Sequence, residues 1–429
     1  MSQRLRTVHA ERRFEDCRPM ELYRARWVLP ASAPPIERGW LAVEAGRIVA
    51  VGAADDAPPA EYGRSRAEDL GDHVLLPGFV NAHTHLELTG YRDRLPAGPL
   101  WPWIEALVAL RRAPEAAETE RVAVRLGAEE SLAAGVTCLG DVSRSGSAAE
   151  ALGDCPLRAV CFLELISGAG RAPSDAASLA AGFTELTAGA RGDRLRIGLS
   201  PHAPYTVTEA DLSRTAELAR ASGAPLAMHF LETTDEVRWL SDGTGPVAAF
   251  LRKNGLPNAE GFSPTDPIDL LQRCGVLDQS PLLIHVNYPS DARLDRLAAA
   301  DVSIAWCPRA HRFFGHSPHP WRSMMARGIR VCIGTDSAAS NDSLSILDEL
   351  RAVRAIAPDF DPCRILQMGT LDGAKALKLD GLVGSLEAGK RADFVTVPMD
   401  VDGGTDPAVN LLDGRTTVDG VWIDGTRVV

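Results

Sequence analysis

The segment LLPGFVNAHTHLE (75–87) begins with an apolar run and ends with two histidines and a glutamate. Similar apolar runs recur through the middle of the chain, each followed by a polar turn and then by a helical pattern. Eight such runs are present: 75–83, 135–142, 157–166, 196–203, 225–232, 281–288, 302–308 and 331–337. Strands that are buried on both faces and alternate with helices indicate a parallel sheet, and eight such units predict a (β/α)8 barrel.

The two ends of the chain have a different pattern. Residues 21–57, 392–397 and 416–429 are rich in short apolar alternations broken by glycine and proline, which is typical of strands and turns. Neither end alone is long enough to bury a core, so we expect them to form one domain together. The prediction is a disordered extension over 1–20, with Met20 as an alternative start to Met1, a composite β-sandwich of 21–77 and 385–429, and a barrel over 78–384.

The composition excludes several classes of partner. The chain has 429 residues, of which 45% are hydrophobic and 24% charged, and its net charge is −12. An acidic protein does not favour nucleic acid or anionic membrane, and no apolar stretch reaches the roughly 18–20 residues of a membrane span. The eight cysteines contain no CxxC pair and lie in apolar runs, which predicts reduced thiols and a cytoplasmic location.

Polar residues with metal-binding side chains follow five of the eight predicted strands. In a parallel barrel the active site lies at the carboxyl ends of the strands, where the loops converge. The residues at these ends are His83 and His85 after the first strand, His202 after the fourth, His229 after the fifth, His285 after the sixth and Asp336 after the eighth. The sequence therefore predicts that they meet at one rim of the barrel.

A metal site follows from this arrangement. His83 and His85 are two residues apart, so on an extended strand both side chains point to the same face. Two neutral imidazoles form half of a site for zinc, iron or a similar divalent ion, and His229 and Asp336 would complete it. Such an ion lowers the pKa of a bound water from about 15.7 to about 7. We expect one divalent ion, zinc first and iron as the alternative.

Several segments also resemble a known family. PGFVNAHTHLE (77–87), HFLE (229–232), LLIHVNY (282–288) and GTDSAASND (334–342) resemble the signature segments of the amidohydrolase superfamily, in its aminohydrolase branch of chlorohydrolase-like and cytosine-deaminase-like enzymes. GSLEAGKRADFVTV (384–397) is similar to the C-terminal return strand of that branch. The resemblance extends from about residue 21 to the end of the chain, and it implies a metal-dependent hydrolase.

The resemblance also implies roles for individual residues. His83, His85, His229 and Asp336 match the metal ligands, Glu232 matches the acid/base carboxylate and His285 matches the histidine that assists the attacking water. Asp336 is expected to take a proton from that water as well. Binuclear members have a carboxylated lysine at the end of the fourth strand, and RIGLSPHAPY (196–205) contains no lysine. This absence favours a single ion and deamination.

The sequence defines the substrate contacts less closely than the metal ligands. His202 resembles a histidine that contacts the substrate in purine-deaminating members, and Glu87 is close enough to the histidine pair to overhang the pocket or to remain a solvated loop carboxylate. In the seventh loop, CPRAHRFFGHSPHPW (307–321), the predicted contacts are Arg309, His311 and Phe313. The loop is otherwise expected to be a lid, with Trp101 and Trp103 in a second one.

The leading function is hydrolytic deamination of a 6-aminopurine nucleoside, because the seventh loop and GTDSAASND resemble aminodeoxyfutalosine deaminases of menaquinone biosynthesis. The nearest alternatives are S-adenosylhomocysteine, methylthioadenosine or adenosine deaminases, followed by pyrimidine, pterin or triazine aminohydrolases. More remote alternatives are hydrolysis of a chloride or an amide, and a catalytically inactive scaffold. The expected partners are a small-molecule heterocyclic amine and a second copy of the chain in a homodimer, without nucleic acid or membrane.

Overall fold

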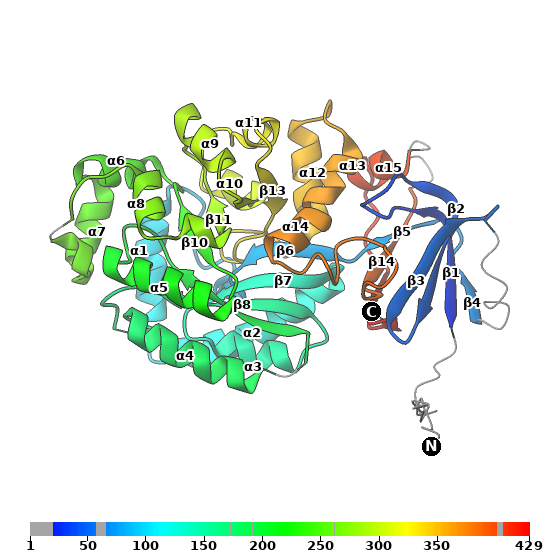
Figure 1. Ribbon diagram of the computed structural model, residues 1–429, viewed down its shortest axis with the longest axis horizontal. Helices are drawn as coiled ribbons and strands as arrows, with labels where there is room; N and C mark the ends of the chain where they lie inside the picture. The colour runs from blue at the N-terminus through cyan, green and yellow to red at the C-terminus, as the bar shows by residue number, and fades with distance from the viewer. Residues whose placement is uncertain (1–19, 57–65, 171–172, 191, 261, 401–405) are drawn as a thin grey trace, which may run out of the picture.

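The computed structural model describes residues 20–56, 66–170, 173–190, 192–260, 262–400 and 406–429. The predicted extension lies outside these residues except for Met20, so its disorder and the choice of start stay predictions. Figure 1 shows a large α/β body and a smaller β-rich body at one end of it. In the described part of the chain, no helix is both long and apolar enough to cross a membrane.

Eight parallel strands form the centre of the large body. They lie in two four-stranded sheets, with strand orders β6-β7-β8-β9 and β10-β11-β12-β13. Their bounds are β6 Phe79–Thr84, β7 Val136–Ser143, β8 Arg158–Leu165, β9 Leu195–Pro201, β10 Ala227–Phe230, β11 Leu282–His285, β12 Ser303–Trp306 and β13 Arg330–Ile333. Each predicted run overlaps one of these strands.

Single bridges join the two sheets at both seams. Leu199 pairs with Leu226 between β9 and the start of β10, and Thr84 pairs with Asp336 between β6 and the residues after β13, both in parallel. The eight strands therefore follow one another in a ring in chain order, which confirms the predicted (β/α)8 architecture. The first run, 75–83, spans parts of two strands and not one, because β5 (His73–Pro77) belongs to another sheet and β6 begins after Gly78.

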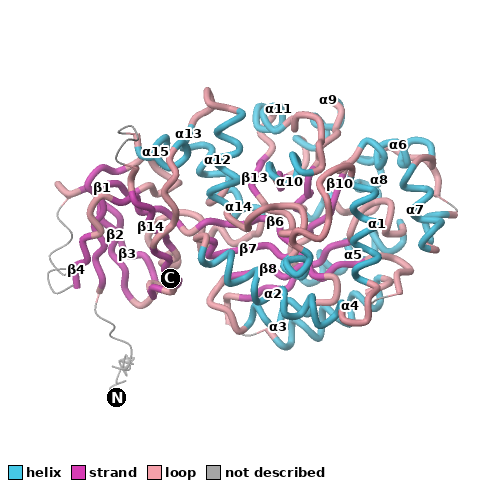
Figure 2. The backbone as a smooth tube through the Cα atoms, turned by 180° about the vertical axis from the view of Figure 1, so that it is seen from behind, coloured by secondary structure: helices cyan, strands magenta, loops and turns pink. Residues whose placement is uncertain are grey.

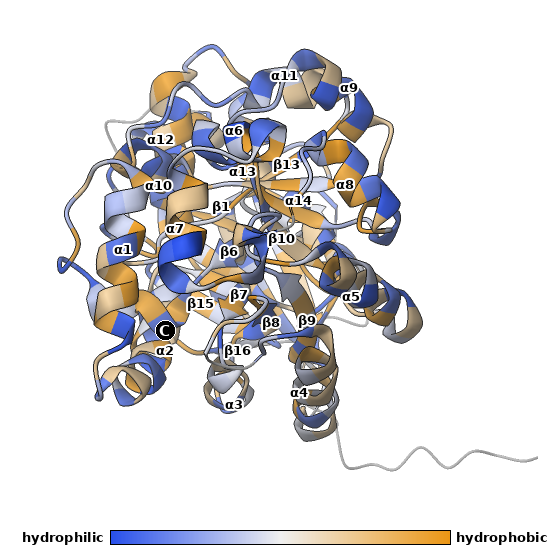
Figure 3. Cartoon of the chain, turned by 90° about the vertical axis from the view of Figure 1, so that its left-hand side faces the viewer, coloured by the Kyte–Doolittle hydropathy of each residue, from blue (hydrophilic) through white to orange (hydrophobic). Residues whose placement is uncertain are grey.

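Helices follow every barrel strand and cover the outside of the ring (Figures 1 and 3). Their bounds are η2 Leu86–Tyr91, α1 Leu100–Arg111, α2 Ala116–Ala133, α3 Ser147–Gly153, α4 Ala176–Gly189, α5 Glu209–Ser222, α6 Thr234–Asp242, α7 Pro246–Asn254, η3 Pro257–Ala259, α8 Pro267–Arg273, η4 Leu277–Gln279, α9 Asp291–Ala298, α10 Pro308–Phe313, α11 Trp321–Ala326, α12 Ile346–Ile356, α13 Pro362–Met368 and α14 Leu371–Ala376. The segments 208–223, 292–301 and 321–328 include α5, α9 and α11.

The barrel has an inner and an outer apolar layer, because successive side chains of a strand point to opposite faces. On β8, Ala159, Cys161 and Leu163 pack outward against the helices. Val160 and Phe162 of the same strand pack inside the barrel. The next inward position is at the carboxyl end of the strand, where the inner layer stops and polar side chains begin.

The small body contains strands from both ends of the chain. Eight strands form one hydrogen-bonded sheet in the order β16-β15-β14-β5-β1-β2-β3, with β4 paired to β1. The remaining bounds are β1 Glu21–Val28, β2 Ile36–Glu44, β3 Arg47–Ala53, β4 Arg66–Asp69, β14 Phe394–Pro398, α15 Pro407–Asp413, β15 Gly420–Ile423 and β16 Thr426–Arg427. β14 pairs antiparallel with β5, so residues more than 300 positions apart share a ladder. Figure 2 shows β14 in the same body as β1, β2, β3 and β4.

A buried network of ion pairs connects this sheet to the amino-terminal ends of the barrel strands. Arg158, at the start of β8, donates from Nε to Asp393 at 2.6 Å and from Nη2 to Asp424. The side chains of Arg158 and Asp393 are each 1% exposed. Since a buried charge is costly without a partner, this network favours one relative placement of the two bodies.

Candidate active site

A cavity of about 270 Å³ opens at the carboxyl ends of the barrel strands. This volume is close to the lower end of the roughly 300–1,000 Å³ typical of small-molecule sites. The cavity is lined on one side by polar groups from the strand ends and on the other by apolar side chains of α1 and α7. The polar residues include His85, His202, His229, His285, Glu87, Glu164, Glu232 and Asp336.

The four predicted metal ligands converge at the floor of this cavity. His83, His85 and His229 each offer a ring nitrogen, and these three atoms lie within 4.8 Å of one another. The Nε2 atoms of His85 and His229 are 3.3 Å apart. Asp336 Oδ1 lies 3.7 Å from His83 Nε2 and 3.9 Å from His85 Nε2. The structure thus brings together side chains from the first, fifth and eighth strands.

Hydrogen bonds across the β6–β13 seam fix the distance between His83 and Asp336. The Oδ1 of Asn81 accepts the backbone N–H groups of His83 and Thr335, while its Nδ2 donates to Thr335 Oγ1 at 2.8 Å. Thr84 Oγ1 donates to the carbonyl of Asp336 at 2.9 Å. Asp336 has φ 58°, a conformation that non-glycine residues adopt only with such local support.

The electrostatics of the cluster favour neutral imidazoles beside an ionised carboxylate. Burial, and then the neighbouring His83, lower the pKa of His85 to about 4. Burial also lowers the pKa of His229 well below its usual value. Burial raises the pKa of Asp336, but its interactions with His83 and His285 outweigh this effect, so the pKa lies below the usual range.

This donor set fits a divalent metal ion. His85 Nδ1 contacts the carbonyl of Val142 at 3.2 Å, which assigns its proton to Nδ1 and leaves Nε2 free to bind an ion. Both ring nitrogens of His83 are buried without a hydrogen-bond partner among the described residues. A buried, unpaired polar atom is costly, and coordination of a cation would satisfy it. Three nitrogens and one carboxylate suit zinc or iron.

Glu232 and His285 lie next to this cluster. Glu232 Oε1 is 3.5 Å from His285 Nε2, and both residues are buried. Burial, followed by the charges of Asp336 and Glu236, raises the pKa of Glu232 well above its usual value. Burial lowers the pKa of His285 well below its usual value. A carboxylic acid that keeps its proton near neutrality is suited to general acid catalysis.

The backbone of Glu232 is fixed by two side chains that the sequence analysis did not identify. Glu236 accepts the backbone N–H groups of Leu231 and Glu232, both at 2.9 Å. Asn287 Nδ2 donates to the carbonyl of Glu232 at 3.0 Å. The helical pattern after HFLE predicts a helix N-terminus near Glu236, but the partners of its carboxylate are set by the left-handed conformation of Leu231 (φ 50°).

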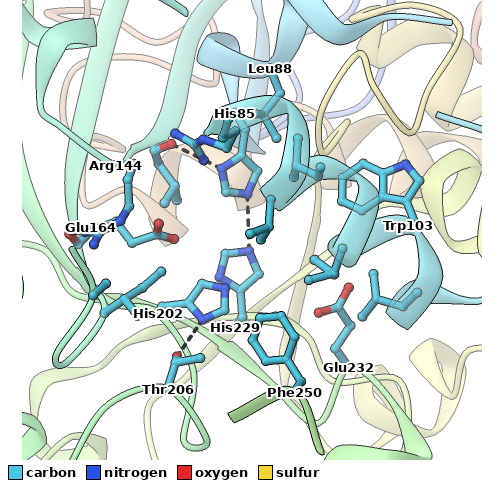
Figure 4. A pocket seen from close by; sticks show the side chains of 18 of the residues that line it. His85, Leu88, Trp103, Arg144, Glu164, His202, Thr206, His229, Glu232 and Phe250 are labelled. Atoms are coloured by element: carbon cyan, nitrogen blue, oxygen red, sulfur yellow. Dashed lines mark hydrogen bonds between the residues drawn. The ribbon is translucent and has the colours of Figure 1, made fainter. Parts of the chain in front are cut away.

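His202 lies in the cavity, as the sequence analysis expected, beside a residue that it missed. His202 Nδ1 contacts Thr206 Oγ1 at 2.7 Å. Glu164, at the end of β8, points into the same space (Figure 4). Ring nitrogens of His202 and His229 and a carboxylate oxygen of Glu164 lie within 4.8 Å of one another. Alternation along β8 could have identified Glu164, because it continues the inward series of Val160 and Phe162.

Glu87 lines the cavity but is not a solvated carboxylate. It is 2% exposed, and its oxygens accept hydrogen bonds from Ser143 Oγ, from the backbone N–H of Arg144 at 3.2 Å and from Arg111 Nη2 at 3.2 Å. Ser145 and Ser147 also donate to it. Glu87 therefore neutralises part of the Arg111 charge at the wall of the cavity. Its predicted contact with substrate stays a prediction.

The three predicted contacts in the seventh loop lie outside the cavity lining. Arg309 turns toward the loop after β13, where Nη1 donates to Ser343 Oγ at 2.8 Å and Nη2 to Asp342 at 3.0 Å. His311 contacts Asn287 Oδ1 at 3.2 Å and the carbonyl of Ser317 at 2.7 Å. Phe313 packs beside Phe314, and of this pair only Phe314 lines the cavity. The predicted substrate contacts of Arg309, His311 and Phe313 thus have no support in this geometry.

Two further segments pack around the site: the end of the seventh loop with His319, and the start of α1 with Trp101 and Trp103. His319 Nε2 donates to the carbonyl of His285 at 2.8 Å and stacks on Trp306, so this loop supports His285 from behind. Trp101 lines the cavity from α1, and its Nε1 donates to Asp235 at 3.0 Å. Trp103 also lines the cavity (Figure 4), and the expected role of the Trp101 and Trp103 segment as a lid stays a prediction.

Comparisons with known proteins agree with this geometry. Residues 74–428 match the model of the amidohydrolase family. The chain is 32% identical to a 5-methylthioadenosine/S-adenosylhomocysteine deaminase of Moorella thermoacetica, over 87% of this chain and 84% of the relative.

Two solved structures share the fold along their length. The structure of an adenosine deaminase from Xanthomonas campestris with bound zinc has a TM-score of 0.81 at 27% identity, covering 95% of this chain and 92% of the other. Helicobacter pylori aminofutalosine deaminase, in complex with methylthio-coformycin, has a TM-score of 0.83 at 25% identity, covering 95% of this chain and all of the other (100%).

Proposed function

The chain belongs to the amidohydrolase family, and from this premise we propose that it is a metal-dependent deaminase of a 6-aminopurine nucleoside. The reaction replaces the exocyclic amine with oxygen and releases ammonia. The observation on which the proposal depends is the convergence of three histidines and Asp336 beside Glu232 at one cavity. The names of the similar proteins support a nucleoside substrate.

His83, His85, His229 and Asp336 would hold one divalent ion, zinc first and iron as the alternative. Such an ion supplies a water molecule that is acidic enough to act as a nucleophile at neutral pH. The zinc in the Xanthomonas structure and the donor set of this chain support zinc. Asp336, whose Oδ1 lies 3.7 Å from His83 Nε2, would accept a proton from the attacking water.

Glu232 performs the second proton transfer. Its raised pKa favours the protonated form, which can donate to the ring nitrogen next to the reacting carbon and make that carbon more electrophilic. His285, 3.5 Å from Glu232, donates a hydrogen bond to the oxygen that becomes negative during attack. Each well-placed proton transfer contributes about 10²–10⁴-fold in rate.

The cavity wall opposite the polar residues supports a nucleoside with an apolar substituent. Leu100, Trp101, Ile104, Phe250 and Phe314 lie there. We propose aminodeoxyfutalosine as the first substrate to test, with 5′-methylthioadenosine and S-adenosylhomocysteine next and adenosine as the unsubstituted reference. The acidic net charge and the free cysteines support a cytoplasmic enzyme. We also propose that the chain forms a homodimer, which light scattering would test.

The test is ammonia release from this set of nucleosides by protein of known metal content. Glu232→Gln keeps the size of the side chain but removes the acid, so turnover should fall to near zero while the metal content stays at one ion per chain. Retained activity would refute the role of Glu232. No ammonia from any aminopurine would refute the substrate class.

A further inference from the structure

The two residues to which we assign proton transfer and hydrogen bonding in the reaction, Glu232 and His285, lie on strained backbone. Leu231, which precedes Glu232, has φ 50°. His285 and the following Val286 have φ 72° and 51°. Left-handed backbone at residues other than glycine is costly, and it persists only where neighbouring groups hold it. The directions of the Glu232 and His285 side chains therefore depend on what binds the backbone around them.

The peptide group between His285 and Val286 is held at both ends. Its N–H, on Val286, donates to the carbonyl of Phe230 at 2.9 Å. Its carbonyl, on His285, accepts from Nε2 of His319 at 2.8 Å. In the described part of the chain, His319 is not among the residues that line the cavity. It is therefore placed to act on the reaction through His285, and not by touching the substrate.

The ring of His319 is itself fixed. It stacks on Trp306, with ring centroids 4.9 Å apart and an angle of 10° between the planes, and Trp306 stacks on Trp321 in turn. Burial lowers the pKa of His319 to about 3, so the ring is neutral near neutral pH and carries a single N–H. Because the carbonyl of His285 needs a donor, this N–H is on Nε2, and His319 is a rigid donor to the backbone of His285.

The same loop also reaches the backbone of Glu232. Asn287 Nδ2 donates to the carbonyl of Glu232 at 3.0 Å, and Asn287 Oδ1 lies 3.2 Å from Nδ1 of His311 in α10. The amide of Asn287 thus lies between the seventh loop and Glu232. The carbonyl groups of Glu232 and His285 are each bound by a side chain that belongs to this loop or contacts it.

On the basis of the proposed function, we propose that the seventh loop (307–321) positions both residues, with His319 as the positioning residue for His285 and Asn287 as the one for Glu232. While the loop holds both carbonyl groups, His285 Nε2 stays 3.5 Å from Glu232 Oε1, and both side chains face the cavity. Without the N–H of His319, the left-handed backbone at His285 relaxes and the ring turns out of its place. The loss is then in kcat and not in KM, because the cavity walls that bind the substrate are unchanged.

Two substitutions separate the hydrogen bond of His319 from its packing. His319→Phe keeps a ring on Trp306 but removes the N–H. It should lower kcat about 10- to 100-fold, between the loss of one hydrogen bond and a displacement of about 1 Å, with KM close to the wild type and one metal ion per chain. His319→Gln keeps an N–H donor but loses the stacking, so it should recover part of kcat at a lower melting temperature. Arg312→Gln is the matched control, because Arg312 is exposed on α10.

The assay is ammonia release from the nucleoside of the set above that the wild type deaminates fastest. In His285→Asn, the residue that His319 supports is already lost, so adding His319→Phe should lower the residual kcat little further. Asn287→Asp replaces the donor to Glu232 by an acceptor and should lower kcat by a factor similar to that of His319→Phe.

An equal fold-loss from His319→Phe in the wild-type and the His285→Asn backgrounds would overturn the proposal, since His319 would then act independently of His285. A wild-type kcat in His319→Phe or in Asn287→Asp would also overturn it. If the wild type released no ammonia from any aminopurine, the proposed function itself would fail. That result is read from the wild type alone, so it is distinct from the other outcomes.

Discussion

Loss of the Glu236 carboxylate is expected to impair catalysis while the metal ligands stay in place. Glu236 is 1% exposed, and its two oxygens accept the backbone N–H groups of Leu231 and Glu232, both at 2.9 Å. Leu231 adopts φ 50°, which a leucine tolerates only when neighbouring groups compensate. The direction of the Glu232 side chain therefore depends on Glu236, which is not itself placed to touch the substrate.

The magnitude follows from the two hydrogen bonds. A buried N–H without an acceptor costs about 1–3 kcal/mol, so Glu236→Ala should lower the free energy of unfolding by about 2–6 kcal/mol. A displacement of about 1 Å in a catalytic group costs about 10²-fold in rate. We therefore expect kcat of Glu236→Ala to fall about 100-fold. Glu236→Gln keeps one acceptor and should be intermediate in both stability and kcat.

The assay combines ammonia release, metal content and thermal melting for wild type, Glu236→Ala and Glu236→Gln. Glu217→Gln is the control, because Glu217 is exposed on α5. Metal content should stay at one ion per chain in all four proteins. The reasoning is refuted if Glu236→Ala keeps the wild-type kcat, or if Glu236→Gln loses as much activity as the alanine variant.

Three further outcomes are expected. Chelation should abolish turnover and lower the melting temperature, and zinc should restore both; turnover in protein shown to be free of metal would contradict the site. Arg158→Met should lower the free energy of unfolding by about 3–5 kcal/mol in denaturant titrations, because Asp393 remains buried without its main partner, and Asp393→Asn in the same chain should recover part of the loss. Burial raises the pKa of Glu349 to about 8, so its stabilising contribution is full below its unfolded pKa, roughly 4.3, and is lost as pH rises through about 8. The melting temperature should thus fall between about pH 4.3 and pH 8, less so in Glu349→Gln; an equal fall in both would exclude Glu349 as the cause.

The barrel could be predicted because its signals are local. A strand buried on both faces needs an unbroken apolar run, and a helix on the outside needs a 3.6-residue pattern, so both are visible within a few residues of each other. The run 75–83 was interpreted as one strand although it contains parts of two, since both halves are apolar and only their partners differ: β5 pairs with β14, and β6 with β7.

In the candidate site, too, residues with a local sequence signal could be predicted, and the tertiary partners of side chains could not. His83, His85, His229, His285 and Asp336 were identifiable because each ends a strand, and the ends of parallel strands meet at one rim. The partners of polar side chains on loops were not identifiable. Arg309 turns to Ser343 and His311 to Asn287, contacts that span 34 and 24 residues and depend on how two loops pack.

Sequence alone therefore determined the order of strands and helices and the residues at the strand ends, because backbone hydrogen bonding and burial impose a short period on the chain. Tertiary structure alone decided which carboxylates are shielded, paired or open to a ligand. Glu87, Glu164 and Glu236 are the same residue type, but the first is bonded to Arg111 and three serines, the second has an unpaired oxygen in the cavity and the third accepts two backbone N–H groups. These differences come from atoms contributed by other strands and loops, which no local pattern encodes.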